Sequence, residues 1–246
     1  MKRKLFALLT AAVVLALPSL TSAAGRSFYL IGNSLTWDTV PSKLSGDVQW
    51  HVDCGKPLHY IHKNPAKPCV KSSTLWPEAL KAKQYDYLSM QSHYGATLEQ
   101  DVETISKWIE MQRQAIIVIH TGWARSASRA EEYAQTKPAG KMQHSRAHIG
   151  ALIKRLKKRF PGREIRQTHA QELLARVAAD AAAGKAPIAD VKELYRDAIH
   201  MNVVTGRYLM HNAMRHALGQ PRSQEGFNKL EPKMKKYLDS VLDSLK

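Results

Sequence analysis

The sequence predicts an α/β fold in which a mostly parallel sheet of five strands is covered by helices on both faces. Short apolar runs of strand length alternate along the chain with longer segments whose apolar residues recur at helical spacing. The run from Ala115 to His120 is rich in β-branched residues, which is typical of a strand buried on both faces. With 246 residues, of which 44% are hydrophobic, the chain is long enough for one such domain with a sizeable core.

Each expected element follows from its local pattern. A strand, helix, strand order favours right-handed crossovers and therefore parallel strands. The stretch 56–73 is expected to be a long loop, and 124–142 a mixture of helix and loop over one edge of the sheet. The expected strands are 28–31, 47–53, 85–90, 115–120 and 164–168, and the expected helices are 74–83, 98–113, 145–160, 171–183, 203–218 and 232–245.

The first 24 residues have the composition of a secretory signal peptide. Three cations, Lys2, Arg3 and Lys4, precede an apolar run over 5–17, and small residues lead to an expected cleavage site after Ala24. The alternative is a membrane anchor, but the apolar run is shorter than the roughly 20 residues that span a bilayer. We therefore expect a periplasmic or secreted α/β domain over 25–246, without a stable membrane anchor after cleavage.

Two cysteines, Cys54 and Cys69, are expected to form a disulfide, because export would place them where such bonds persist. A bridge that closes so short a loop would contribute on the order of 3 kcal/mol. The alternatives are two free buried thiols, or a zinc site that also uses His51, His59 and His62. The spacing of these residues matches no closed zinc pattern, so we expect neither a metal nor another cofactor.

The chain is strongly basic, with a formal net charge of +16 that removal of the signal-peptide cations would lower to +13. Such a surface attracts polyanions. For an exported protein we expect acidic polysaccharide, lipopolysaccharide or phospholipid headgroups rather than nucleic acid as the partner. The densest basic run, 154–159, is also typical of the solvated face of a helix.

Ser34, Asp197 and His200 are the candidate catalytic residues. A serine hydroxyl becomes a nucleophile when an imidazole removes its proton, and the imidazole needs a carboxylate to fix its tautomer. Gly32 and Asn33 follow an apolar strand and give the backbone freedom for a sharp turn before Ser34. Asp197 and His200 are three residues apart, which on a helical turn places both side chains on one side.

These three residues also have structural interpretations. Serine commonly caps a helix, which Ser34 could do without any catalytic role. Asp197 and His200 could form an ordinary surface ion pair. The catalytic interpretation is favoured because several candidate residues fall just past predicted strands, and sites in parallel sheets form at the carboxyl ends of strands. These positions are Ser34, Gly55, 91–95 and 121–123.

The segment Gly32-Asn33-Ser34-Leu35-Thr36 resembles the first block of the SGNH hydrolases, also called the GDSL family, in a GNSLT variant. The segment 197–202, followed by Gly206 and Tyr208-Leu209, is similar to the last block of that family, and the resemblance spans 28–218. It implies a three-layer α/β/α fold and ester hydrolysis through an acyl-serine. In that mechanism Ser34 is the nucleophile, His200 the general base and Asp197 its partner.

The resemblance also implies an oxyanion hole. The Ser34 N–H and a glycine of the second block, matched by Gly55, would be two of its donors. The family's third block has an asparagine in a Gly-x-Asn-Asp pattern, which this chain lacks. Because a glutamine N–H can donate as an asparagine does, we expect Gln91 to be the third donor. His93 and Trp123 are weaker candidates for substrate contact, with polar pairing and core packing as their alternatives.

Together these patterns predict an exported serine esterase that uses no cofactor. Its charge and compartment favour O-acetyl groups on acidic envelope or extracellular polysaccharide as the substrate, with lipids or small esters as a second class. A different kind of function also fits the sequence. The chain could be a non-catalytic basic protein that binds envelope polyanions on a hydrolase scaffold.

Overall fold

A computed structural model describes residues 25–245 of the chain, so the predicted signal peptide lies outside the described residues. Its centre is a five-stranded sheet in the order β2-β1-β3-β4-β5, in which every neighbouring pair is parallel. This confirms the predicted sheet. The strands are β1 (Ser27–Gly32), β2 (Asp47–Val52), β3 (Tyr87–Gln91), β4 (Ile116–His120) and β5 (Ile165–Gln167).

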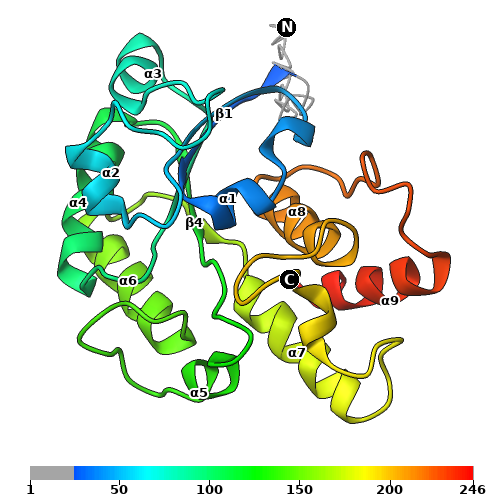
Figure 1. Cartoon of the computed structure of the whole chain (residues 1–246). Helices are drawn as coiled ribbons and strands as arrows, with labels where there is room; N and C mark the ends of the chain where they lie inside the picture. Colours follow the sequence, from blue (N-terminus) through cyan, green and yellow to red (C-terminus); the bar gives the residue numbers. More distant parts are fainter. Residues whose placement is uncertain (1–24, 246) are drawn as a thin grey trace, which may run out of the picture.

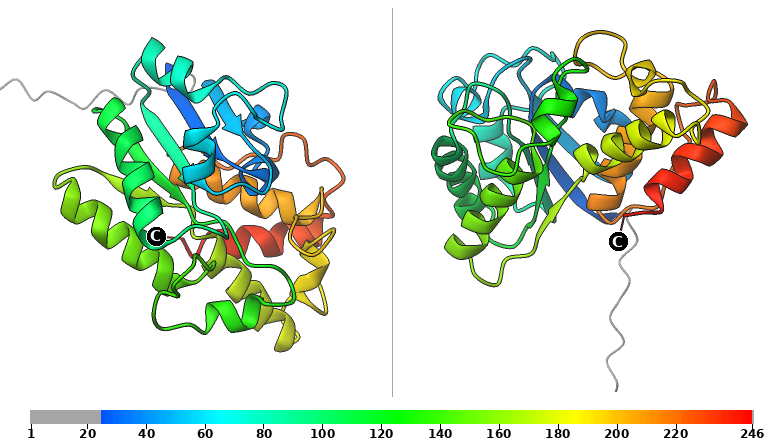
Figure 2. Two further views of the ribbon diagram at one scale, coloured as in Figure 1. Left: turned by 60° about the vertical axis from the view of Figure 1, so that its left-hand side comes forward. Right: turned by 90° about the horizontal axis from the view of Figure 1, so that it is seen from below.

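Helices cover both faces of the sheet and give the predicted three-layer α/β/α arrangement (Figures 1 and 2). A short helix, α5 (Arg129–Tyr133), lies in the segment that follows β4. One face carries α2 (Leu58–Lys63), α3 (Trp76–Ala82), α4 (Leu98–Met111) and α6 (Arg146–Arg159). The other carries α1 (Ser34–Asp38), α7 (Ala170–Ala182), α8 (Thr205–Ala217) and α9 (Pro232–Leu242).

Alternate residues of the central strands enter two different cores, as the pleat of a strand requires. In β1, Tyr29 and Ile31 join the cluster under α2, α4 and α6, whereas Phe28 and Leu30 join the cluster under α8. In β4, Ile117 belongs to the first cluster and the residue after it to the second. The strands are apolar on both faces and are held between two helix layers. This packing fixes the position of the sheet edge where β1, β3 and β4 end.

The segment expected to be one long loop, 56–73, contains the helix α2, so that prediction was wrong. Pro57 precedes the helix, and Leu58 and Ile61 are fully buried against the core. Only two of its apolar residues are buried in so short a helix, which is why its periodicity is weak. The predicted disulfide between Cys54 and Cys69 closes the segment, with their Cα atoms 5.6 Å apart.

Two histidines of the zinc alternative are used in packing. His62 stacks on Trp76 with ring centroids 4.8 Å apart, and the Nδ1 of His51 accepts a hydrogen bond from the backbone N–H of Trp76. Among residues 25–245, no group of three or more histidine, cysteine or acidic side chains is arranged to hold a metal ion. No helix in this part of the chain combines the length and apolar character needed to cross a membrane.

Candidate active site

The nucleophile turn, residues 32–36 around the candidate nucleophile Ser34, follows directly from the end of β1. Asn33 caps α1 by accepting a hydrogen bond from the Leu35 N–H at 3.0 Å, and Ser34 is the first residue of the helix. Gly32 is required for space rather than for backbone freedom, since a Cβ there would lie 2.9 Å from the Cβ of Gln91. Strand β3 therefore packs closely against this turn, and Ser34 remains partly exposed at the sheet edge.

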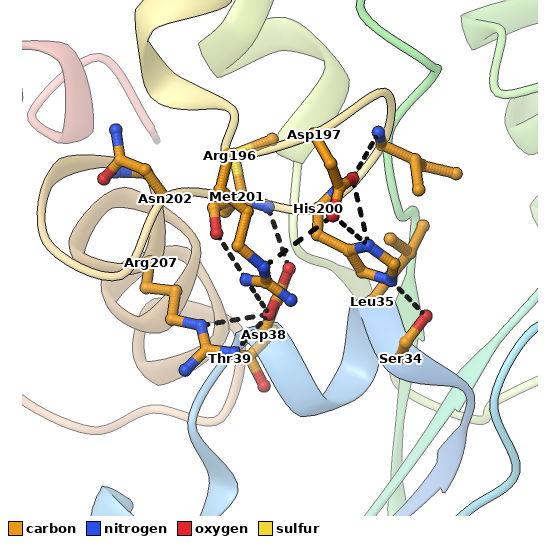
Figure 3. Close-up of polar contacts among 12 residues, drawn as sticks. Ser34, Leu35, Asp38, Thr39, Arg196, Asp197, His200, Met201, Asn202 and Arg207 are labelled. Atoms are coloured by element: carbon orange, nitrogen blue, oxygen red, sulfur yellow. Dashed lines mark hydrogen bonds and ion pairs between the residues drawn. The ribbon is translucent and has the colours of Figure 1, made fainter.

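The structure brings Ser34, His200 and Asp197 into one hydrogen-bonded chain (Figure 3). The Nε2 of His200 lies 2.9 Å from the Oγ of Ser34, and its Nδ1 lies 2.9 and 3.0 Å from the two carboxylate oxygens of Asp197. A carboxylate can only accept, so Nδ1 carries the proton and Nε2 is left as the acceptor for the serine hydroxyl. This is the order of nucleophile, base and orienting group that acyl transfer needs.

Asp197 and His200 lie on a tight turn before α8, not on a helical turn, so that part of the prediction was wrong. The Asp197 carboxylate accepts hydrogen bonds from the backbone N–H groups of Ile199 and His200 at 2.9 and 2.8 Å. An isolated bridge between Tyr195 and Met201 closes the base of the turn. The spacing of three residues brings the side chains together here because the aspartate organises its own turn.

The same contacts set the charge of Asp197. Slight desolvation raises its pKa, but the backbone hydrogen bonds and the His200 imidazole outweigh this and lower it to about 2. The carboxylate is therefore ionised through the neutral and mildly acidic range, where it can hold the Nδ1 proton of His200.

Trp123 packs beneath the turn of Asp197 and His200 and does not face a substrate, which had been one expectation. Its side chain is fully buried, and its indole N–H donates to the carbonyl of Ile199 at 2.6 Å. The neighbouring Ser126 N–H donates to the carbonyl of Ala198 at 2.9 Å. The segment after β4 thus supports the turn through two consecutive carbonyls. Indole burial with a satisfied N–H is usual for tryptophan in a core.

A buried aspartate that the sequence did not single out joins the turn to the nucleophile helix. Asp38, the last residue of α1, accepts hydrogen bonds from Arg196 at 3.0 Å, from Arg207 at 2.7 and 3.0 Å, and from the Met201 N–H at 2.8 Å (Figure 3). Its side chain is only 1% exposed. The one signal in the sequence is its position four residues after Ser34, where a helix places both on one side.

Gln91 is placed differently from its predicted role as an oxyanion donor. Its Oε1 accepts hydrogen bonds from the Asn33 N–H, the Thr36 N–H and the Thr36 hydroxyl at 3.2, 3.1 and 2.9 Å. Its Nε2 donates to the carbonyl of Ser92 at 3.2 Å, and the side chain is fully buried. Two backbone donors around one oxygen fix the orientation of the amide. Gln91 therefore holds the nucleophile turn from below and does not reach a substrate.

We expect Gln91→Leu to lower the free energy of unfolding by about 2 kcal/mol, because it leaves buried donors of Asn33 and Thr36 without an acceptor. Chemical denaturation measures this loss. The rate at which Ser34 reacts with a serine-directed fluorophosphonate, per folded molecule, should fall as well. Gln112→Leu is the matched control, since Gln112 is equally buried and is hydrogen-bonded at 2.8 to 3.0 Å to the backbone of Tyr85, Leu80 and Lys83, away from Ser34. Equal reactivity of the two variants would contradict a role for Gln91 in holding the turn.

Gly55 lies beside the nucleophile turn but does not end β2, which finishes at Val52. It occupies the third position of a turn closed by the Lys56 N–H on the Asp53 carbonyl, with a φ of +67° that favours glycine. The carbonyl of Lys56 accepts from the Asn33 side chain at 3.3 Å, which ties this turn to the start of α1. Among residues 25–245, the backbone N–H groups of Ser34 and Gly55 have no acceptor.

Comparison with known proteins agrees with this architecture. No family model matches the sequence, and no curated protein matches it either. The structure is similar to a lipase/acylhydrolase from Enterococcus faecalis, with a TM-score of 0.50 and 13% identity over 81% of this chain and 99% of that one. It is equally similar to a protein from Parabacteroides merdae described as a GDSL-like lipase, at 15% identity, over 82% and 99% of the two chains. The chain therefore has the fold of the SGNH, or GDSL, hydrolases, as the sequence resemblance implied.

Proposed function

We propose that this protein is a serine esterase that hydrolyses a carboxylic ester through an acyl-serine intermediate. The observation that carries this proposal is the unbroken chain of hydrogen bonds from Asp197 through His200 to Ser34, at the carboxyl edge of a parallel sheet. Sites in such sheets form at this edge. The SGNH-type fold supports the same reaction class, by analogy only.

The proposed reaction begins when the Oγ of Ser34 attacks the ester carbonyl carbon while the Nε2 of His200 takes the hydroxyl proton. The carbonyl oxygen becomes an oxyanion, which the free N–H groups of Ser34 and Gly55 are available to bind. Collapse of this intermediate breaks the bond to the alcohol oxygen, and His200 returns the proton to the leaving alcohol. Water, deprotonated by His200, then attacks the acyl-serine and releases the acid with Ser34 restored.

Labelling with a serine-directed fluorophosphonate tests this proposal. We expect one label per molecule, located by mass spectrometry on the peptide that contains Ser34, and release of acid from a simple acetyl ester. Ser34→Ala should lose both, whereas Ser240→Ala, at an exposed position on α9, should keep both. Folded, oxidised protein that takes up no label would reject the esterase and favour a non-catalytic binding protein for envelope polyanions.

For the substrate, we propose O-acetyl groups on an acidic envelope or extracellular polysaccharide. The net charge is +16, or +13 without the three cations of the predicted signal peptide, and attracts polyanions. The side chains of His200 and Asp197 are 27% and 48% exposed. Such an open site suits an acyl group presented on a large polymer. Acetyl release from acetylated acidic polymers, compared with hydrolysis of long-chain esters, tests this choice. Activity confined to long acyl chains would favour a lipid substrate instead.

A further inference from the structure

The proposed esterase needs a side-chain donor for its oxyanion, and the described residues point to one. The backbone N–H groups of Ser34 and Gly55 are free, but the side chain of Gln91 is already hydrogen-bonded to the nucleophile turn. Oxyanion sites are most effective when several donors converge in fixed positions. A suitable side chain would be close to Ser34, rigid and mostly shielded from water, and would have an unused hydrogen-bond donor.

His93 lies on the segment that leaves the carboxyl end of β3. It follows Gln91 by two residues at the carboxyl end of β3, which is the strand that pairs with β1. The side chain of Gln91 already touches the backbone of Asn33 and Thr36 on either side of Ser34. The exit of β3 therefore runs along the nucleophile turn, and His93 is on that exit.

The imidazole of His93 is held by two supported rings. Its centroid lies 5.1 Å from Tyr94 and 5.6 Å from His144. The Tyr94 hydroxyl donates to Glu132 at 2.7 Å, and the Nδ1 of His144 lies 3.0 Å from the carbonyl of Thr121. Because each supporting ring is itself hydrogen-bonded, the orientation of His93 is fixed before any substrate binds.

The two ring nitrogens of His93 have different surroundings. The ring is only 8% exposed, and Nδ1 is buried without a hydrogen-bond partner. Nε2 is not among the buried atoms and has no partner within residues 25–245, so it is the nitrogen that meets solvent. An unpartnered N–H is rarer in protein interiors than an under-used acceptor. The tautomer with the proton on Nε2 is therefore favoured, and its donor faces outward.

We propose that the Nε2–H of His93 is the side-chain donor to the oxyanion, in the place that Gln91 was expected to fill. This inference rests on the proposed esterase function. A neutral imidazole can serve as such an electrophile.

The charge state of His93 suits this role. Burial, followed by the nearby His144, Arg125 and His200, lowers its pKa to about 3, so the ring is neutral at the pH of catalysis. Glu132 acts in the opposite direction but does not reverse the shift. A neutral donor stabilises the oxyanion without repelling the imidazolium that forms on His200.

The test compares His93→Phe, which keeps a ring between Tyr94 and His144 but has no donor, with the unchanged enzyme. We expect kcat to fall by about 10²- to 10³-fold with little change in KM. The loss should be constant between pH 6 and 9, since a ring with a pKa of about 3 does not titrate there. His93→Asn, which restores an amide donor, should recover part of the rate, whereas His62→Phe, in the aromatic stack with Trp76, should be unaffected.

If the His93→Phe variant does not fold, a measurement on the unchanged protein can still test the role of His93. Phosphonylation of Ser34 places a P–O oxygen where the oxyanion would form, and the Nε2–H proton resonance of His93 should move downfield on labelling. An unmoved resonance, or a His93→Phe enzyme with full kcat, would overturn the role of His93 while leaving the esterase intact. Failure of Ser34 itself to label would instead overturn the function, and the His93 donor with it.

Discussion

Replacing His200 by alanine is expected to lower kcat for ester hydrolysis by about 10⁴- to 10⁶-fold, because no other base within residues 25–245 is hydrogen-bonded to the Ser34 hydroxyl. The Nε2 of His200 is 2.9 Å from the Oγ of Ser34, close enough to take its proton as the C–O bond forms. Without the imidazole, Ser34 keeps its proton and only substrate binding and the oxyanion donors remain. Steady-state kinetics with an acetyl ester measures the loss, and KM should change little.

Asp197→Asn is expected to give a smaller loss of about 10⁴-fold, since an amide N–H facing Nδ1 would favour the tautomer that removes the acceptor at Nε2. The control for both variants is His216→Ala, on the exposed side of α8, which should keep the full rate. A His200→Ala enzyme within tenfold of the unchanged one would show that the hydrogen-bonded chain seen here is not the catalytic machinery.

The second large effect is expected from Asp38→Ala. Removal of this carboxylate leaves the guanidinium groups of Arg196 and Arg207 without their shared partner and the Met201 N–H without an acceptor. We expect the free energy of unfolding to fall by about 3 kcal/mol, at the low end for a broken buried ion pair. The low end applies because the two arginine side chains are 35% and 22% exposed and can be partly rehydrated.

Asp38→Ala should also lower kcat more than stability alone explains, because Asp38 connects the helix of Ser34 to the turn of His200. Asp239→Ala is the matched control. Asp239 accepts a hydrogen bond from Tyr208 at 2.6 Å and pairs with Arg222 and Lys235, but it lies on α9. Both variants should lose stability in chemical denaturation. If kcat per folded molecule were the same in both, Asp38 would be a stabilising residue with no part in positioning.

Much of the fold could be predicted because its signals are local. The strands are apolar on both faces, as in β4, and the helices have clear amphipathic spacing, so their order along the chain and the parallel character of the sheet were confirmed. The helix α2 was missed because two buried apolar residues, Leu58 and Ile61, cannot establish a period. The residues of the hydrogen-bonded chain were also singled out from local patterns, a glycine turn before Ser34 and a spacing of three before His200.

The roles of Gln91 and Trp123 could not be predicted, because each depends on which way a side chain at a strand end points. Gln91 turns toward β1 and fills the space left by Gly32, whereas Trp123 turns inward under Ile199. A residue type states what a side chain can donate or accept, not which neighbour is within reach. For Asp38 the obstacle is distance along the chain, since its partners are about 160 residues away.

The ion cluster around Asp38 has a consequence for the newly made polypeptide. Ser34 and His200 are separated by 166 positions, so the hydroxyl emerges early in synthesis and the imidazole near its end. Among residues 25–245, the ion-pair partners of Asp38 are Arg196 and Arg207, which flank His200 in the sequence and are therefore made at the same late stage. Under the proposed mechanism, we therefore expect an incomplete chain to be inert at Ser34 and the finished molecule to gain reactivity only after residue 200 has been made.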